Sequence, residues 1–230
     1  MLPRYLNALR TEVEGIPDEL DYASLRRQYS NPRSLQSRKL HLALTLVPRG
    51  NRLLDVGSGE GEWIERALQK FDFVVGLETS TIALALLRDR FRGNSRVEIS
   101  ERAITEISDS PGQANAFDAV TMLDVLEHVA DASDILRSSY HLLRPGGVIV
   151  TTTPNWYDKL LIPITRNKFH LQAHSSVGWS RIVRDVGFDV TRTRTVDFPI
   201  FSSEALCTSL HILGICVLVQ GQKPILGRKG

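Results

Sequence analysis

The chain has 230 residues, of which 42% are hydrophobic and 23% charged, with 16 glycines and 10 prolines. This composition is that of an ordinary globular protein, and it excludes collagen-like, strongly disordered and coiled-coil proteins. The net charge of +2 conceals an uneven distribution: residues 1–50 carry 8 basic and 5 acidic side chains, residues 51–154 carry 10 and 16, and residues 155–230 carry 10 and 5. An acidic centre therefore lies between two basic ends.

The part of the sequence before residue 49 predicts an N-terminal helical cap, residues 1–48, interrupted at Pro17 and Pro32. Its last helix has an apolar face, and Arg38 and Lys39 are expected to be exposed beside it. The apolar face consists of Leu35, Leu42 and Leu46.

Short apolar runs alternate with amphipathic segments through residues 51–153. Strands are expected at 52–56, 73–77, 97–100, 117–123 and 148–150. Helices are expected at 82–91 and at 131–143, where residues 144–147 end the second helix, and a loop is expected at 108–115. This alternation predicts an α/β fold with a doubly wound, mostly parallel sheet. A helix over 177–186 and strands over 188–196 and 213–219 predict a final antiparallel pair on the same sheet.

The two cysteines, Cys207 and Cys216, are too few for a disulfide framework and are not spaced as zinc ligands, so a reducing compartment is expected. The N-terminal sequence becomes acidic before any apolar run, which does not fit a signal peptide. The apolar stretch 205–219 is too short for a bilayer of about 30 Å and predicts a buried helix followed by a buried strand. We therefore expect a cytoplasmic protein without a membrane span, and its oligomeric state is left open.

Three glycines, Gly57, Gly59 and Gly61, form a turn between the first strand and the first helix of the sheet. A glycine turn lets the backbone approach a ligand closely, because no Cβ intervenes. In an open α/β sheet ligands bind beyond the carboxyl ends of the strands, where this turn is expected. Glu78, at the end of the second strand, can accept hydrogen bonds from a ribose diol there.

Two cofactors fit this turn. A dinucleotide needs the spacing G-x-G-x-x-G and a helix start that accepts a pyrophosphate, whereas here the third glycine comes one residue early and Glu60 and Glu62 lie at the helix start. S-adenosylmethionine has no phosphate and carries a positive sulfonium, so acidic neighbours are tolerated. The residues favour S-adenosylmethionine, with an NAD-dependent dehydrogenase as the alternative.

Four blocks of the sequence stand in a characteristic order: LLDVGSGEG at 53–61, VVGLE at 74–78, FDAVTMLDVLEHV at 117–129 and LRPGGVIVTTTPN at 143–155. Together they resemble the signature blocks of the class I S-adenosylmethionine-dependent methyltransferases, in particular the ubiquinone-pathway type and methyltransferase types 11 and 23. The resemblance implies a seven-stranded Rossmann-like sheet, a single methyltransferase domain over residues 49–230 and a methyltransferase activity (EC 2.1.1.-).

The same resemblance implies a cofactor site. It assigns the amino-acid end of the cofactor to Asp55 and to the glycine turn with Ser58, the ribose to Glu78 and Thr79, and the methionine or adenine side to Leu123 and Asp124. Many members carry an acidic residue after the third strand, but here Arg102 stands at that position and Glu101 precedes it. Adenine is therefore expected at the backbone of Arg102 and Ala103, or at Glu101.

Two polar residues directly after the fourth strand, Glu127 and His128, are the candidates for catalysis. His128 is a possible general base, with a charge that changes near neutral pH, and Glu127 is its neighbour. The alternative is that both residues only pack the start of the next helix. Methylation of a hydroxyl group on a small molecule is the favoured activity.

The string DVLEHV followed by TPN resembles two subgroups, the ubiquinone-pathway O-methyltransferases and the small-RNA 3′-terminal 2′-O-methyltransferases. In the RNA group, an acidic residue, a Glu-His pair and a downstream histidine bind a divalent metal, which would correspond here to Asp124, Glu127, His128 and either His170 or His174. These ligand types suit such a cation. Because His174 lies five residues before Trp179 rather than the four expected of that group, no metal site is predicted.

Basic side chains in both flanks could form a rim for RNA phosphates or for an acidic small molecule. They are Arg26, Arg27, Arg33, Arg38 and Lys39 in the first flank, and Arg166, Lys168, Arg181, Arg184, Arg192 and Arg194 in the second. No aromatic residues are interleaved with them, so a solvated surface is the favoured interpretation and nucleic acid the less favoured partner. Four residues are expected either to line the acceptor pocket or to form a small core under a loop, namely Trp156, Tyr157, Phe169 and His170. A catalytically silent cofactor-binding protein is the remaining alternative.

Overall fold

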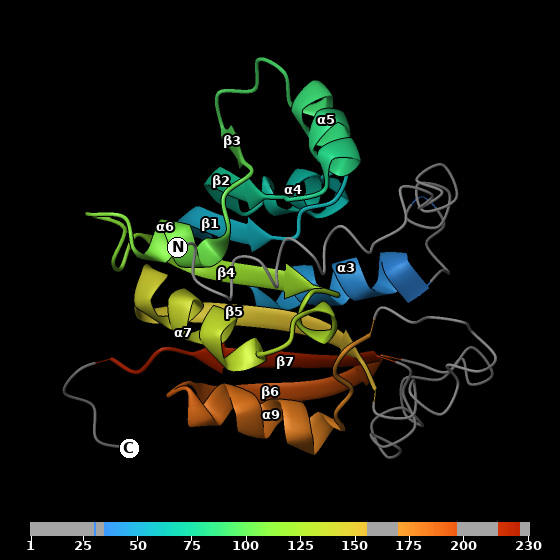
Figure 1. Ribbon diagram of the computed structural model, residues 1–230, viewed down its shortest axis with the longest axis vertical. Coiled ribbons are helices and arrows are strands. Elements are labelled where there is room, and N and C mark those ends of the chain that lie inside the picture. The colour runs from blue at the N-terminus through green and yellow to red at the C-terminus, as the bar shows by residue number, and fades with distance from the viewer. Residues whose placement is uncertain (1–29, 31–34, 156–169, 197–215, 226–230) are drawn as a thin grey trace, which may run out of the picture.

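One sheet of seven strands, in the order β3-β2-β1-β4-β5-β7-β6, runs through the computed structural model (Figure 1), which describes residues 30, 35–155, 170–196 and 216–225. The strands are β1 (Gly50–Val56), β2 (Phe71–Leu77), β3 (Val97–Ser100), β4 (Phe117–Leu123), β5 (Leu143–Pro154), β6 (Asp189–Val196) and β7 (Cys216–Gln222). Among them β7 runs opposite to the other six strands and is antiparallel to both of its neighbours, β5 and β6. The predicted α/β fold with a doubly wound, mostly parallel sheet is confirmed.

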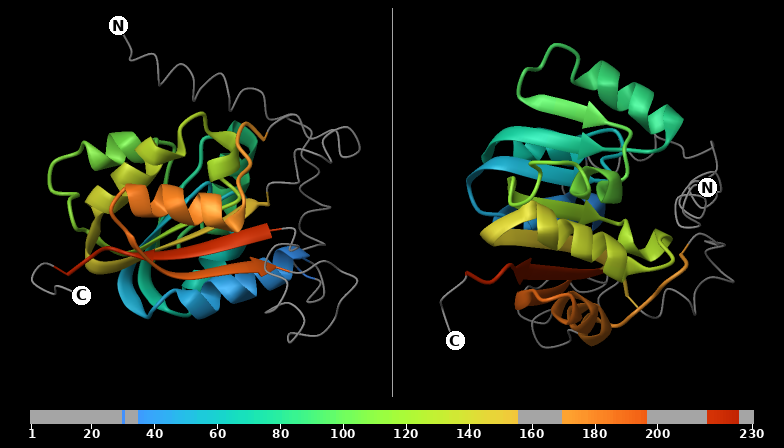
Figure 2. Two further views of the ribbon diagram at one scale, coloured as in Figure 1. Left: turned by 90° about the horizontal axis from the view of Figure 1, so that it is seen from below. Right: turned by 60° about the vertical axis from the view of Figure 1, so that its left-hand side comes forward.

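Helices cover both faces of the sheet (Figure 2). On one face lie α3 (Leu35–Leu46), α4 (Glu62–Ala67) and α5 (Thr81–Arg90), and on the other lie α6 (Ile104–Ser108), α7 (Ala132–Leu142) and α9 (Ser176–Asp185). Each layer has its own apolar core against the sheet. The central strand β4 is buried on both faces, which explains its nearly continuous run of apolar residues.

The residues expected to end the helix before β5 are part of that strand. Helix α7 ends at Leu142, and β5 begins at Leu143 and continues through residues 144–147. A shift in the pairing of β4 with β5 between Phe117 and Ala119 accommodates the extra residues. Gly147 fits this bend because a Cβ there would lie 2.8 Å from the carbonyl oxygen of Arg144.

Two further features differ from the sequence prediction. Lys39, expected to be exposed, is buried on the same face of α3 as Leu40 and Ala43. The short helix α6 was not predicted, and it forms because Ile104 and Ile107 pack into the core beside α7.

Some predictions lie outside the described residues. These are the N-terminal part of the helical cap, the aromatic side chains of Trp156, Tyr157 and Phe169, and the helix expected before β7. The division of the chain at residues 48 and 49 stays a prediction. Within the part of the chain that the structure describes, none of the helices has the length and apolar character needed to cross a membrane.

Candidate functional site

The carboxyl ends of the central strands meet at one edge of the sheet. The register pairs Val56 at the end of β1 with Leu77 of β2 and with Met122 of β4, and it pairs Leu123 with Thr152 of β5. The glycine turn, Glu78 and Asp124, each of which follows one of these strands, therefore lie along the same edge. This is where ligands bind in open parallel sheets.

The glycine turn combines a tightly packed position with an open one. Gly57 has a φ of 72° and Gly59 a φ of 53°, both in the left-handed region that favours glycine. A Cβ on Gly57 would lie 2.6 Å from Cγ2 of Val125, whereas a Cβ on Gly59 would meet no atom within 4 Å. The N–H groups of Gly57 and Ser58 donate to the carbonyl of Leu77 at 2.8 and 3.0 Å, which fixes the turn against β2. A side chain at Gly57 would thus overlap Val125, whereas the space beside Gly59 is open.

Asp55, near the end of β1, places a buried carboxyl group beneath this turn. Thr121 donates to its Oδ1 at 2.8 Å and itself accepts from Nε1 of Trp63 at 2.8 Å. Oδ2 has no hydrogen-bond partner among the described residues. Burial raises the pKa of Asp55 to about 7. A ligand group that donates a hydrogen bond to Oδ2 would satisfy this oxygen, since buried polar atoms usually have a partner.

Glu78 connects the end of β2 with the glycine turn. Its carboxylate accepts hydrogen bonds from the N–H groups of Gly59 at 2.7 Å and of Thr79 and Ser80 at 2.8 Å each. The hydroxyl of Ser80 in turn caps α5. The side chain of Glu78 is half-buried and Thr79 is exposed. An oriented carboxylate at this place suits the hydroxyl groups of a ribose. On the other side of the turn, Gly61 packs against Phe91.

Beyond β3, the groups predicted for adenine are engaged within the protein. The guanidinium of Arg102 donates to the carbonyl of Glu106 at 2.6 Å and to Oγ of Ser110 at 2.7 Å. The N–H of Ala103 donates to the Glu106 carboxylate at 3.0 Å. Glu101 is exposed and pairs with Arg88. An adenine contact in this segment stays a prediction.

At the end of β4, Asp124 forms an ion pair with the buried Lys39 of α3. Thr152 donates from Oγ1 to Oδ1 of Asp124 at 2.8 Å. Although burial alone would raise the pKa of Asp124, the ammonium group of Lys39 and these hydrogen bonds hold it below its ordinary value. The φ of Asp124 is 58°, so the chain turns sharply directly after Leu123.

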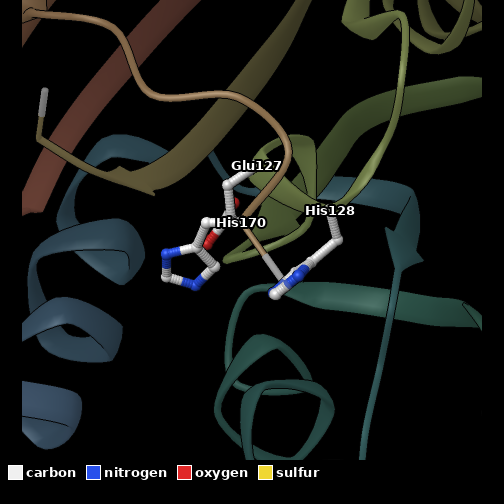
Figure 3. Close-up of side chains that lie close together, drawn as sticks. All are labelled: Glu127, His128 and His170. Carbon is white, nitrogen blue, oxygen red and sulfur yellow. The ribbon is translucent and has the colours of Figure 1, made fainter. Parts of the chain in front are cut away.

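The two residues predicted for catalysis lie in η1 (Leu126–His128), a short 3-10 helix that follows this turn. Glu127 is buried and His128 is half-buried. The structure brings His170 to them, with ring centroids of His128 and His170 5.0 Å apart (Figure 3). His174 lies elsewhere, with its ring against Trp179 at 4.8 Å.

Sequence reasoning missed Lys39 and left His170 as one of two candidates. The signal for Lys39 was its spacing from Ala43 and Leu46, which are four and seven residues further along the helix and thus on the same face. His170 carries no local signal, because its place depends on how a distant segment packs.

Comparison with known proteins gives the family. Residues 25–193 match the methyltransferase domain family. The ubiquinone biosynthesis O-methyltransferase of Pseudomonas entomophila is 34% identical over 106 residues, which are 46% of this chain and 45% of that protein. The enzyme of the same name from Neisseria meningitidis is 27% identical over 178 residues, which are 71% of this chain and 75% of that one. The chain thus spans about half the length of the first of these relatives.

Solved structures show the same fold. A chain in the complex between the Haloferax volcanii Trm112 methyltransferase activator and a methyltransferase superposes with a TM-score of 0.68, at 16% identity, over 93% of this chain and 97% of that chain. The family implies S-adenosylmethionine as methyl donor. The residues fit this cofactor for three reasons. Oδ2 of Asp55 has no hydrogen-bond donor among the described residues, the space beside Gly59 is open, and Glu78 offers an oriented carboxylate. The chain belongs to the methyltransferase domain family, within the class I S-adenosylmethionine-dependent methyltransferases.

Proposed function

We propose that this methyltransferase transfers the methyl group of S-adenosylmethionine to a hydroxyl oxygen of a small molecule. The observation that carries the proposal is the position of Glu127 and His128 directly beyond β4, at the same sheet edge as the glycine turn. A hydroxyl oxygen attacks well only when it loses its proton, so acid–base groups beside the acceptor favour transfer to oxygen. The names of the ubiquinone biosynthesis relatives, which are O-methyltransferases, also support it.

The donor site that we propose keeps the assignments drawn from the sequence. Asp55, Gly57, Ser58, Gly59 and Gly61 hold the amino-acid end, Glu78 and Thr79 hold the ribose, Arg102 and Ala103 face the adenine, and Leu123 and Asp124 border the methionine side. The glycine turn brings the first group to the strand ends, and the unpartnered Oδ2 of Asp55 would accept from the ammonium of the cofactor.

When bound, S-adenosylmethionine would supply the methyl group, whose bond to sulfur would break as its bond to the acceptor oxygen forms, leaving a neutral thioether. The hydroxyl proton would leave to a base. His128 is the candidate for this base, with Glu127 beside it, and much of the remaining rate comes from holding the oxygen in line with the methyl group. We expect the reaction in the cytoplasm, as the cysteine content suggests.

The test is a screen of acceptors with a labelled methyl donor. The panel contains phenols, catechols, sugars, amines and a short RNA with a free 3′-terminal ribose. Transfer to a small hydroxyl compound, reduced by about 10²-fold or more in His128→Ala, is the expected result. His141→Ala, which changes an exposed histidine on α7, serves as the matched control and should keep full activity.

Each other outcome of the screen contradicts the proposal in its own way. Transfer only to amines would exclude oxygen as the acceptor atom, and transfer only to the RNA would replace the small molecule by a nucleic acid. Donor binding without transfer to any member of the panel would favour a catalytically silent cofactor-binding protein.

A further inference from the structure

Three side chains that can bind a metal meet beyond the end of β4. The carboxylate of Glu127 and the imidazoles of His128 and His170 each offer one ligand atom, and these atoms all lie within 4.8 Å of one another. In Figure 3, Glu127 and His128 project from η1, and His170 reaches them from a separate segment of the chain. We infer that this group is a binding site for one divalent transition-metal cation.

The fold itself brings the three ligands together. The N–H groups of Leu171 and Gln172 donate to the carbonyl oxygen of Glu127 at 2.7 and 3.2 Å. The side chain of Gln172 donates from Nε2 to the carbonyls of Val129 and Ala130 at 2.6 and 3.0 Å. The segment that carries His170 is therefore tied to the turn that carries Glu127. Because the ligands are already close, binding a cation orders few additional groups.

The ligand types indicate which cations fit. One carboxylate and two imidazoles suit Zn²⁺, Co²⁺, Fe²⁺ or Mn²⁺, whereas Mg²⁺ and Ca²⁺ prefer oxygen ligands alone. Metal–ligand bonds of roughly 2.0–2.2 Å place the ligand atoms roughly 3–3.5 Å apart. The three side chains must therefore close by about 1 Å, which rotation of the two half-buried imidazoles can supply. Three protein ligands leave at least one coordination position open for another molecule.

Two residues considered as ligands from the sequence do not belong to this set. Asp124 is held by Lys39 and Thr152, so its carboxylate would have to break the ion pair to reach a cation. His174 packs against Trp179 and contacts the side chain of Gln172. The site is thus a three-ligand site, and the proposal departs from the sequence-based expectation that no metal is bound.

The role of the cation rests on the proposed function. A cation with an open position can take the acceptor hydroxyl as a ligand and lower the pKa of that hydroxyl, as bound metals do for water. The hydroxyl proton then passes to solvent, and the oxygen bonds to the methyl carbon as the sulfur–carbon bond breaks. In this arrangement His128 is a metal ligand rather than the base.

Metal binding is tested on the full chain without donor or acceptor. The protein is stripped with a chelator, transferred to metal-free buffer and titrated with Zn²⁺ by calorimetry, and with Co²⁺ by visible absorption. We expect one ion per chain. His170→Ala should weaken binding by more than about 100-fold, because loss of even an outer-shell partner weakens metal binding by about 10–100-fold.

Two controls keep the result interpretable. His141→Ala removes an exposed histidine far along α7 and should leave metal binding unchanged. Thermal unfolding of His170→Ala without metal checks that the half-buried position tolerates alanine, and His128→Ala provides a second ligand variant. A Kd of the wild type for Zn²⁺ above about 1 mM would contradict the proposed site. Equal Kd values in the wild type and in both ligand variants would also contradict it.

The result of the metal titration can be distinguished from the result of the acceptor screen. Stoichiometric binding that His170→Ala abolishes, together with transfer to amines only, would support the metal site and contradict the proposed O-methylation. Full-rate methylation of a hydroxyl by protein that binds no cation would do the reverse.

Discussion

The residues proposed for the amino-acid end and the ribose of the donor come from one continuous stretch of the chain, residues 55–80, in which the end of β1, the glycine turn, α4 and β2 follow one another. We call this stretch the donor side. Its contacts include hydrogen bonds that backbone N–H groups donate, such as those of Gly59 and Thr79 to the carboxylate of Glu78. On the acceptor side, Lys39, Asp124 and His170 come from three distant segments. There the contacts join ionisable side chains. We therefore expect backbone geometry to decide the cost of a substitution on the donor side, and the balance of charges to decide it on the acceptor side.

Asp55 should give the largest effect, because burial of its carboxyl group raises its pKa far above the ordinary value. Its pKa of about 7, against 3.8 in an exposed carboxyl, means that the folded protein holds a proton that the unfolded chain releases. The free energy of unfolding of the ligand-free protein should therefore fall as pH rises from about 4 to about 7, by about 4 kcal/mol. Asp55→Asn should lack this fall, which urea unfolding at a series of pH values measures.

Asparagine keeps an acceptor for Thr121, so the variant changes the charge with little change of shape. All other titrating groups are common to both proteins, and the difference between the two curves therefore isolates Asp55. If the free energy of unfolding depends on pH in the same way in both proteins, burial does not raise the pKa of Asp55. The proposed difference between the donor side and the acceptor side would then lose its main support.

Lys39→Met tests the acceptor side. The change leaves the Asp124 carboxylate without its ammonium partner, and breaking a buried pair lowers the free energy of unfolding by about 3 kcal/mol at pH 7. We take the lower end of that range because the side chain of Asp124 is 33% exposed. The pKa of Asp124 lies below its ordinary value, so the stabilisation is complete above about pH 4 and is lost as the pH falls through the lowered pKa.

The double variant Lys39→Met with Asp124→Asn removes both charges and should recover part of the loss. Denaturant unfolding at pH 7 and pH 3 compares the three proteins. If Lys39→Met has the same free energy of unfolding as the wild type at pH 7, the ion pair does not stabilise the fold. Charge pairing would then not explain the arrangement of the acceptor side.

The contrast also explains what the sequence could predict. The seven strands, their mostly parallel arrangement and the glycine turn follow from periodicity and from local spacing, and they are confirmed by the structure. The burial of Lys39 and the approach of His170 to His128 depend on contacts between residues far apart in the chain. The helical spacing of Lys39 from Ala43 and Leu46 indicates its buried face, but local patterns show neither its ion pair with Asp124 nor the packing of a distant segment. Residues 144–147 looked like a helix end because they are the extra residues between Leu143 and Val148, which both pair with β4.

Gly57→Ala should have a smaller effect, on the donor side. The left-handed φ of 72° and the overlap of the new Cβ with Val125 each destabilise the turn, together by about 2 kcal/mol. Gly59→Ala is the matched control, since it shares the positive φ but meets no neighbour, and about 1 kcal/mol is expected. Urea unfolding measures both. Equal losses would mean that contact with Val125 does not restrict the turn.

Glu78→Ala should leave the fold largely in place and weaken donor binding. A carboxylate that accepts from a ribose diol makes charge-assisted hydrogen bonds, and losing them should raise the Kd for S-adenosylhomocysteine at least about tenfold. The same carboxylate orients the N–H groups of Gly59, Thr79 and Ser80, so its removal also loosens the turn. Calorimetric titration measures the affinity, with Glu98→Ala on the exposed face of β3 as the control.

Glu78→Gln separates the two contributions, because the amide keeps one oxygen acceptor for the turn but carries no charge for the ribose. An unchanged Kd in Glu78→Ala would show that the ribose does not bind at the end of β2. The ribose site would then lie outside residues 55–80.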